Sequence, residues 1–174
     1  MKINIVGCGL SGIIAAVVLK EQGHSVEIFE TRKHIGGNCF DGLVNNVMVH
    51  QYGPHLFHTN DDEVWEFVNR YANFNGFESR VSANTSLGRI SIPYNKTTEE
   101  QLGRELSPEE IQDLIFIEYS ERQWGVPWKD LPKSITGRVP NKRDNYDNRY
   151  FTDKYQGIPA GGYTSMLGNM LSHV

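Results

Sequence analysis

The chain has 174 residues, 39% of them hydrophobic, and a formal net charge of −4. This length suits one domain, or one domain with a small second region. The mildly acidic balance gives no general attraction to nucleic acid or to an anionic membrane, and the apolar stretch at 12–19 is too short to span a bilayer. Two cysteines, Cys8 and Cys39, do not indicate a disulfide framework, and the short lead before the first strand leaves no room for a signal peptide, so we expect a cytoplasmic protein.

The first thirty residues have the pattern of a strand–turn–helix–strand unit that binds a dinucleotide. A short apolar strand runs into Gly7-x-Gly9-x-x-Gly12, and a second apolar strand ends just before Glu30. In this unit the first glycine permits a tight turn, the second lets the backbone approach a pyrophosphate, and the third lets the helix pack closely on the strand. The helix directs its amides and positive dipole end at the phosphates, and Glu30 can accept hydrogen bonds from ribose hydroxyls. A glycine-rich turn without a ligand is the alternative, but strand, helix and acid all fall where a dinucleotide requires them.

Periodicity and capping residues predict the remaining elements. In chain order we expect a helix over 11–22, a hairpin of strands around 39–44 and 47–52, a helix beginning at 60 or 61 and reaching 71, antiparallel strands at 77–84 and 89–93, a helix from a capping box at Ser107 to about 119, mostly loop over 125–148, and a last helix over 165–171.

A second glycine pair, Gly36-Gly37, with Asn38 directly after it, closely follows the second strand. Paired glycines let the backbone approach another segment of a cofactor, and the Asn38 amide can hydrogen-bond to that segment. An ordinary loop turn would use the same residues, but the position beside Glu30 favours a ligand. Because folds that bind only NAD do not need this second pair, the pattern favours FAD.

Three of the six histidines, His50, His55 and His58, lie close together in the sequence. Metal ligands must converge, whereas strand periodicity would place His50 and His55 on opposite faces, and no cysteine joins them. We therefore predict no metal site. A turn at 53–55 that touches a flat ring system is favoured, while structural roles for His50 and His58 stay open.

Tyr119 and Trp124 lie near the end of the helix that begins at Ser107. Exposed aromatic side chains at a helix end can stack on a nucleotide base, and simple core packing is an equal alternative. Arg138 stands in a loop between a glycine and a proline, which suits it to binding a diphosphate. An isolated loop arginine is, however, more often only solvated.

Six segments together resemble the UDP-galactopyranose mutase family, in the family's order: IVGCGLSG, ETRKHIGGN, YGPHLFHTND, YSERQWG, LPKSITGRVP and NRYFTDKYQGIPAGGYT. The resemblance spans nearly the whole chain, and the later segments are more specific than the glycine pattern. It implies an α/β fold in which an FAD-binding Rossmann-like domain of the glutathione-reductase type is incomplete and carries a small, mostly helical substrate-side domain. Residues 1–60 and 155–174 would form the discontinuous FAD-binding domain, and residues 61–154 the substrate-side region.

The resemblance also implies an activity. Enzymes of this family interconvert UDP-galactopyranose and UDP-galactofuranose, a precursor in polysaccharide biosynthesis, without net redox change. N5 of reduced FAD acts as the nucleophile at the anomeric carbon of the sugar, so that UDP is expelled and later returns. The protein supplies position and complementary charge.

Residue roles carry over by motif. FAD is expected to contact the glycine turns and the loops after them, at Gly7, Gly9, Ser11, Gly12, Glu30, Thr31, Gly36, Gly37, Asn38, His55 and Leu56. The substrate is expected to contact Phe116, Tyr119, Trp124, Arg138 and Tyr150, with Phe116 stacked on uracil and both Arg138 and Tyr150 at the diphosphate. His55, whose turn would lie against the isoalloxazine, and Arg138 are the expected catalytic residues.

Two departures from the family pattern bear on this hypothesis. Family members usually carry a longer helical insertion between the segments at Pro93 and Ser107, and their C-terminal half has no counterpart here. Either a companion chain supplies that half, with a homodimer as the other possible assembly, or the chain is a non-catalytic remnant that binds FAD or a nucleotide. A flavin amine-oxidase-like oxidoreductase is a further alternative, and the YSERQWG and YQGIPAGGYT segments argue against it.

Overall fold

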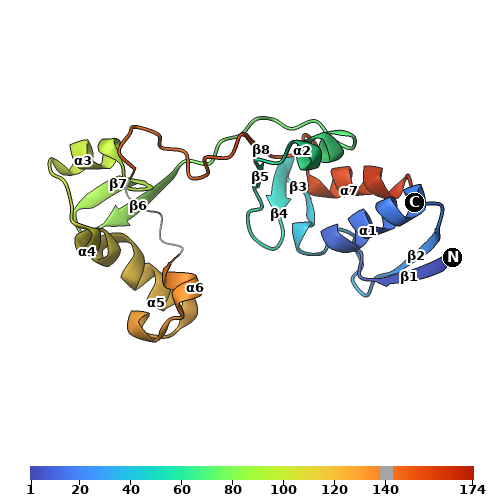
Figure 1. Ribbon diagram of the computed structural model, residues 1–174, viewed down its shortest axis with the longest axis horizontal. Coiled ribbons are helices and arrows are strands. Elements are labelled where there is room, and N and C mark those ends of the chain that lie inside the picture. Colours follow the sequence, from blue (N-terminus) through green and yellow to red (C-terminus); the bar gives the residue numbers. More distant parts are fainter. Residues whose placement is uncertain (138–142) are drawn as a thin grey trace. The chain divides into compact units, whose positions relative to one another are not determined.

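The computed structural model describes residues 1–137 and 143–174 and divides into two units. The first unit comprises Met1–Phe77 and Asp153–Val174, and the second comprises Glu78–Thr152. The second unit is thus an insertion in the sequence of the first (Figure 1).

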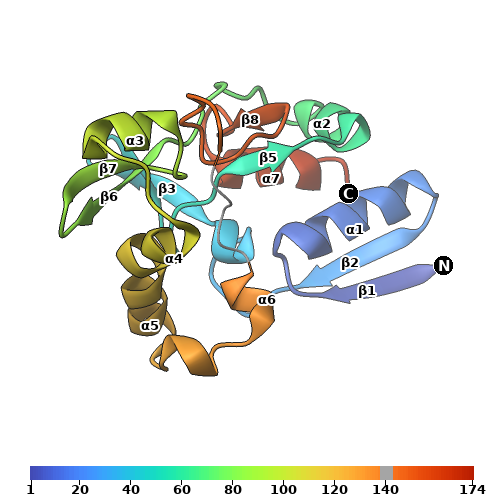
Figure 2. The ribbon, with the colours of Figure 1, turned by 60° about the vertical axis from the view of Figure 1, so that its left-hand side comes forward.

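The first unit is built on a parallel pair of strands and two helices. Strands β1 (Lys2–Val6) and β2 (Ser25–Phe29) pair in parallel, and α1 (Leu10–Glu21) connects them. Helix α7 (Tyr163–Leu171) packs against α1 although it comes from the other end of the chain (Figure 2). The core between these elements includes fully or almost fully buried side chains of both helices: Ile13, Val17, Met166, Leu167 and Met170. The strand–helix–strand unit predicted from the sequence is therefore present.

A hairpin, a second antiparallel strand pair and a helix complete the first unit. After a 3-10 turn at Gly37–Cys39, β3 (Asp41–Val44) and β4 (Val47–His50) pair antiparallel, with Asn45 and Asn46 between them in the left-handed conformation at φ 52° and 63°. Asparagine adopts this conformation more readily than most residues, which explains the tight turn. Strands β5 (Phe57–Thr59) and β8 (Tyr155–Gly157) pair antiparallel, and α2 (Asp62–Asn69) starts at an Asp61 side chain that accepts hydrogen bonds from the Glu63 and Val64 amides.

The second unit has its own hydrophobic core. It contains the antiparallel pair β6 (Val81–Thr85) and β7 (Gly88–Ile92), helix α3 (Lys96–Leu102), and a continuous helical run made of α4 (Pro108–Ile111), the π-helical segment η2 (Gln112–Ile117) and α5 (Glu118–Trp124). Short helices η3 (Trp128–Asp130) and α6 (Lys133–Thr136) follow. The buried side chains gather between β7 and the helices, at Ile90, Ile92, Tyr94, Leu106, Ile111 and Ile115.

The structure differs from the sequence-based expectation at one boundary and at two elements. Helix α2, expected in the substrate-side region, lies in the first unit, because Phe67 and Tyr71 pack on the α1–α7 core. Helix α3 and the β5–β8 pair were not expected. Among the described residues, no helix is both long and apolar enough to cross a membrane.

Candidate dinucleotide site

The turn between β1 and α1 has the geometry that its glycines predict. Gly7 has φ +101°, and its amide donates to the Phe29 carbonyl at 2.7 Å, so the turn is tied to the end of β2. A Cβ on Gly12 would lie 2.1 Å from the Gly7 carbonyl oxygen, a separation that side chains do not reach. Both positions therefore need glycine for local reasons.

The N-terminus of α1 is left open toward a ligand. Its N-cap is Gly9, which offers no side-chain hydrogen bond, and the first turn of the helix has no acidic residue. A twelve-residue helix with uncapped amides presents donors and a positive dipole end to an anion. Ser11 lies in this first turn and is exposed.

The second glycine pair lies directly against the first turn. Gly36 and Gly37 have φ of +89° and +57°, and the Gly36 amide donates to the Cys8 carbonyl at 2.7 Å. A Cβ on Gly37 would lie 3.1 Å from the Gly9 Cα. The structure thus brings together two glycine segments that are far apart in the sequence, and their contact forms a cradle that side chains would fill.

Glu30 is fixed beside this cradle by backbone amides. Its carboxylate accepts from the Arg32 amide at 2.8 Å and from the Cys8 amide at 2.7 Å, with the Thr31 hydroxyl at 3.4 Å. These hydrogen bonds, the one from Arg32 first, lower the pKa of Glu30 to about 2. The carboxylate is therefore anionic at neutral pH, and Oε2, which accepts from the Cys8 amide, retains a lone pair for a further donor.

Sequence reasoning missed a contact between Arg32 and Asn38. The Arg32 guanidinium donates to the Asn38 side-chain oxygen at 3.0 Å and lies 4.9 Å from the centre of the Tyr52 ring. The predicted ligand Asn38 is therefore held by a basic side chain from the loop after β2. The basic composition of that loop, at 32–34, was the only signal in the sequence.

The histidines do not converge on one point. His55 donates its amide to Nδ1 of His50 at 3.0 Å, and its own Nδ1 lies 2.8 Å from the Gly53 carbonyl oxygen, whereas His58 pairs with Asp153. Leu56, next to this turn, is half-buried. No group of three His, Cys, Asp or Glu side chains suited to a metal ion occurs in the part of the chain that the structure describes.

Asp41 was also missed by sequence reasoning. It is only 2% exposed, and its carboxylate accepts from the amides of Tyr163 and Thr164 at the start of α7. Its partners are more than a hundred residues away in sequence, so the local pattern around Asp41 carries no signal for this role.

The predicted substrate residues of the second unit differ in exposure. Phe116, in the π-helical segment, packs against the core, while Tyr119 is 59%, Trp124 50% and Tyr150 38% exposed. A shallow pocket of about 380 Å³ at the end of α5 and the following loop is lined by other residues: Glu118, Glu121, Arg122, Gly125, Val126 and Pro127. None of the predicted substrate residues that the structure describes lines it. The predicted diphosphate ligand Arg138 lies outside the described residues.

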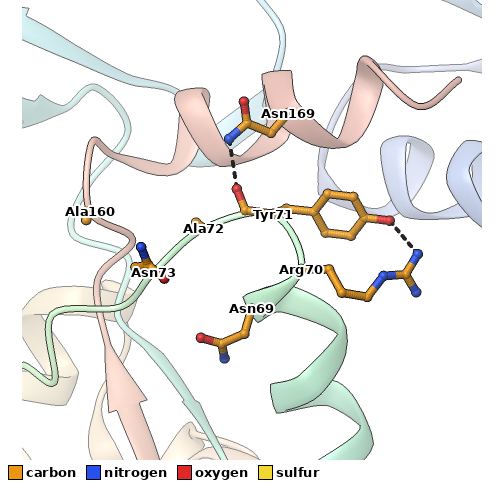
Figure 3. Close-up of a pocket in the computed structure, with 7 residues that line it drawn as sticks. All are labelled: Asn69, Arg70, Tyr71, Ala72, Asn73, Ala160 and Asn169. Carbon is orange, nitrogen blue, oxygen red and sulfur yellow. Dashed lines mark hydrogen bonds between the residues drawn. The ribbon is translucent and has the colours of Figure 1, made fainter.

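A second pocket, of about 360 Å³, lies in the first unit and is polar (Figure 3). Arg70 and Tyr71 form one side, where the guanidinium donates to the Tyr71 hydroxyl at 2.9 Å and pairs with Glu21. Asn169 donates to the Tyr71 carbonyl at 2.8 Å. None of the predicted site residues lines this pocket.

The parallel strand–helix–strand unit and the paired glycine turns define a Rossmann-like fold. The family model described as "NAD(P)-binding Rossmann-like domain" matches residues 5–71. Two solved structures share the fold: a reduced UDP-galactopyranose mutase, with TM-score 0.67 and 18% identity over 98% of this chain and 46% of that one, and an oxidoreductase from Methanosarcina mazei, with TM-score 0.55 and 17% identity over 99% and 49%. The predicted fold class is confirmed.

Sequence similarity points to one family within this fold. The family model described as "UDP-galactopyranose mutase" matches residues 114–174. A dTDP-fucopyranose mutase of Escherichia coli is 38% identical over 99% of this chain and 54% of its own length, and a probable UDP-galactopyranose mutase of Klebsiella pneumoniae is 38% identical over 98% and 53%. The relationship to the UDP-galactopyranose mutase family is thus confirmed, and the chain spans about half the length of the curated relatives it matches.

Proposed function

We propose that this chain forms the cofactor-binding part, and a portion of the substrate-binding part, of an FAD-dependent isomerase that interconverts UDP-galactopyranose and UDP-galactofuranose. The observation that carries the proposal is the contact of Gly9 with the Gly36–Gly37 pair, beside the amide-bound carboxylate of Glu30. This cradle fits a dinucleotide that meets two backbone segments at once.

In the first unit, the amides at the start of α1 would bind the pyrophosphate, and Glu30 would accept from a ribose hydroxyl through the Oε2 lone pair that the Cys8 amide leaves unused. The other residues proposed to contact the cofactor are those of the two turns and the loops next to them: Gly7, Ser11, Gly12, Thr31, Asn38, His55 and Leu56. The 53–55 turn would lie against the flavin ring.

When bound and reduced, FAD would supply the nucleophile for the isomerisation at its N5 atom. The chain's own residues would bind and orient the nucleotide sugar: Phe116, Tyr119 and Trp124 through ring stacking, and Arg138 and Tyr150 through the diphosphate. Tyr119 and Trp124 are exposed enough to reach a ligand, whereas Phe116 would offer only the part of its ring that the core leaves free.

A polypeptide equivalent to the remaining half of the relatives, in the same chain or in another, is part of this proposal. The β1–β2 pair leaves Val6 86% and Phe29 49% exposed, although parallel strands are ordinarily buried on both faces. The hairpin also exposes several apolar side chains, at Leu43, Val44, Val47, Met48 and Val49. Such surfaces indicate a partner segment. A homodimer is the alternative assembly, and light scattering at several concentrations would detect it.

We further propose a reducing, cytoplasmic location, since Cys8 and Cys39 are both free thiols and burial raises the pKa of each, which keeps them unreactive.

Two measurements test the proposed function. FAD titration by flavin fluorescence should show saturable binding that is weakened in Glu30→Ala; absence of binding would refute the cofactor assignment. With dithionite and the complementary half of the Klebsiella relative, UDP-galactofuranose should be converted to UDP-galactopyranose.

The same isomerisation assay with dTDP-fucopyranose tests the other nucleotide sugar, which the Escherichia coli relative suggests. Flavin binding without turnover on either substrate would favour a non-catalytic fragment. Oxygen consumption with amines would instead favour an oxidase, a class that L-amino-acid oxidases at 24% identity represent among the relatives.

A further inference from the structure

A series of polar contacts, hydrogen bonds at both ends and a charge–dipole contact between Asp41 and His50, leads from the start of α7 to the 53–55 turn. At one end, Asp41 Oδ2 accepts from the Tyr163 amide at 2.6 Å, and Oδ1 accepts from the Thr164 amide at 2.8 Å. The Thr164 hydroxyl is also within hydrogen-bond distance of the Asp41 amide and carbonyl, at 2.9 and 2.8 Å. A Cβ on Gly162 would lie 2.7 Å from the Asp41 carboxylate, so glycine at this position leaves room for the carboxylate.

The next member is His50, which lies opposite Asp41 in the β3–β4 register. Its Nε2 is 3.9 Å from Asp41 Oδ2, and its Nδ1 accepts from the His55 amide at 3.0 Å. Because a backbone amide can only donate, Nδ1 of neutral His50 must carry the lone pair, and the ring proton must sit on Nε2, facing Asp41. The side chain is 17% exposed, so the surrounding protein defines its orientation.

His55 must have the opposite tautomer. Its Nδ1 lies 2.8 Å from the Gly53 carbonyl oxygen, which can only accept, so Nδ1 carries the proton and Nε2 the lone pair. The turn itself contains Gly53 at φ +97° and lies between β4 and β5, outside regular structure. The amide of His55, the last residue of the turn, therefore donates its hydrogen bond to a side chain rather than to a neighbouring strand.

We infer that Asp41 and His50 form a positioning pair that sets the conformation of the 53–55 turn. The carboxylate, fixed by the α7 amides, orients the His50 ring, and the ring in turn holds the His55 amide. The inference rests on the proposed function in one respect, namely that the 53–55 turn would contact the planar ring of the cofactor. Asp41 and His50 are positioning residues and need not touch that ring.

The tautomers provide a test that needs no variant and no cofactor. Imidazole ¹⁵N shifts of the full chain should show His50 protonated at Nε2 and His55 protonated at Nδ1 near neutral pH. The groups that face His50 are Asp41 from β3, His55 from the turn and Tyr163 from α7, whose ring lies edge-on at 5.7 Å. A His50 ring protonated at Nδ1 at neutral pH would overturn the inference.

Three variants separate positioning from packing. His50→Asn retains an acceptor near the place of Nδ1, His50→Gln moves its amide group out toward Asp41 and leaves no acceptor at the place of Nδ1, and His50→Phe has no polar side-chain atom. Exchange of the His55 amide should accelerate about tenfold in the Gln and Phe variants, as expected for loss of one hydrogen bond, and should stay near wild type in the Asn variant. His58→Asn, which alters a histidine paired with Asp153 in the same unit, is the matched control and should leave this amide unchanged.

FAD affinity is measured in parallel on the same proteins. Affinity should fall in His50→Phe and recover in His50→Asn. If the exchange pattern holds but no protein binds FAD, the proposed function fails and the positioning pair stands. If His50→Asn exchanges as fast as His50→Phe, the pair has no positioning role.

Discussion

Replacement of Gly12 by alanine tests the geometry on which the dinucleotide site depends. The new Cβ would lie 2.1 Å from the Gly7 carbonyl oxygen, whereas ordinary contacts begin near 3.4 Å, so helix and turn must separate by about 1.3 Å. Both atoms belong to rigid segments, and forcing such segments apart costs about 3 kcal/mol. Alanine also gains about 1 kcal/mol of helix propensity over glycine. We expect Gly12→Ala to lower the free energy of unfolding of the first unit by about 2 kcal/mol.

Gly168→Ala is the matched control, because it makes the same change inside α7, where a Cβ would meet nothing within 4 Å. Only the propensity gain applies there, so this variant should be stabilised by up to about 1 kcal/mol. The two alanine variants should therefore differ by about 3 kcal/mol with opposite signs relative to wild type.

Urea unfolding followed by Trp65 fluorescence provides the assay. Trp65 lies in α2 of the first unit and stacks on Tyr155, so its emission should change when that unit unfolds. Trp124 and Trp128, the other two tryptophans, are replaced by phenylalanine in every protein measured. For a slope of about 2 kcal/mol per molar urea, the midpoint of Gly12→Ala should fall by about 1 M. A midpoint at or above wild type would refute the reasoning about the turn.

Three further predictions concern single side chains. The pKa of Glu30 falls from an ordinary 4.5 to about 2 in the folded chain, so its stabilising contribution is complete above pH 4.5 and disappears as the pH approaches 2; Glu30→Gln should flatten the pH dependence of the urea midpoint in that window, and an unchanged profile would contradict the assignment. Asn95, which is fully buried, caps α3 and donates to the Asp147 carbonyl at 3.0 Å; Asn95→Ala should cost the second unit about 2 kcal/mol by thermal unfolding, and a loss below about 0.5 kcal/mol would refute both roles. Trp124→Ala should leave stability within about 0.5 kcal/mol but weaken UDP binding at least tenfold by calorimetry; unchanged affinity would exclude Trp124 from the site.

Local sequence predicted the elements whose signals are local. The glycines at 7, 9 and 12 and the Asn45-Asn46 turn each determine a backbone conformation through their own residue types, and the structure has the strands, helix and hairpin that they predict. The capping box at Ser107 likewise starts a helix, in which Ser107 accepts from the Glu110 amide. Helix α3 has the same kind of signal, an Asn95–Thr98 capping box, but its polar sequence has no apolar period, so the sequence pattern does not predict a helix there.

Long-range contacts could not be predicted in this way. The β5–β8 pair joins Phe57–Thr59 to Tyr155–Gly157, two segments too short to show a strand period. The role of Asp41 depends on amides at 163 and 164, and the carboxylate of Glu30 accepts from the amide of Cys8, 22 residues away in sequence. In each case the partner is set by tertiary packing, which a single sequence does not encode at the residue concerned.

The π-helical segment at Gln112–Ile117 has a consequence for changes in the length of this helical run. A π-helical turn holds one more residue than an α-helical one, so deleting a single residue there would restore regular winding and leave Tyr119 and Trp124 at about the same azimuth. Deleting Ser120 from the regular winding of α5 would instead rotate Trp124 by about 100° about the axis relative to Ile111 and the core beneath it. The wide turn can therefore lose one codon without turning the aromatic side chains away, whereas α5 cannot.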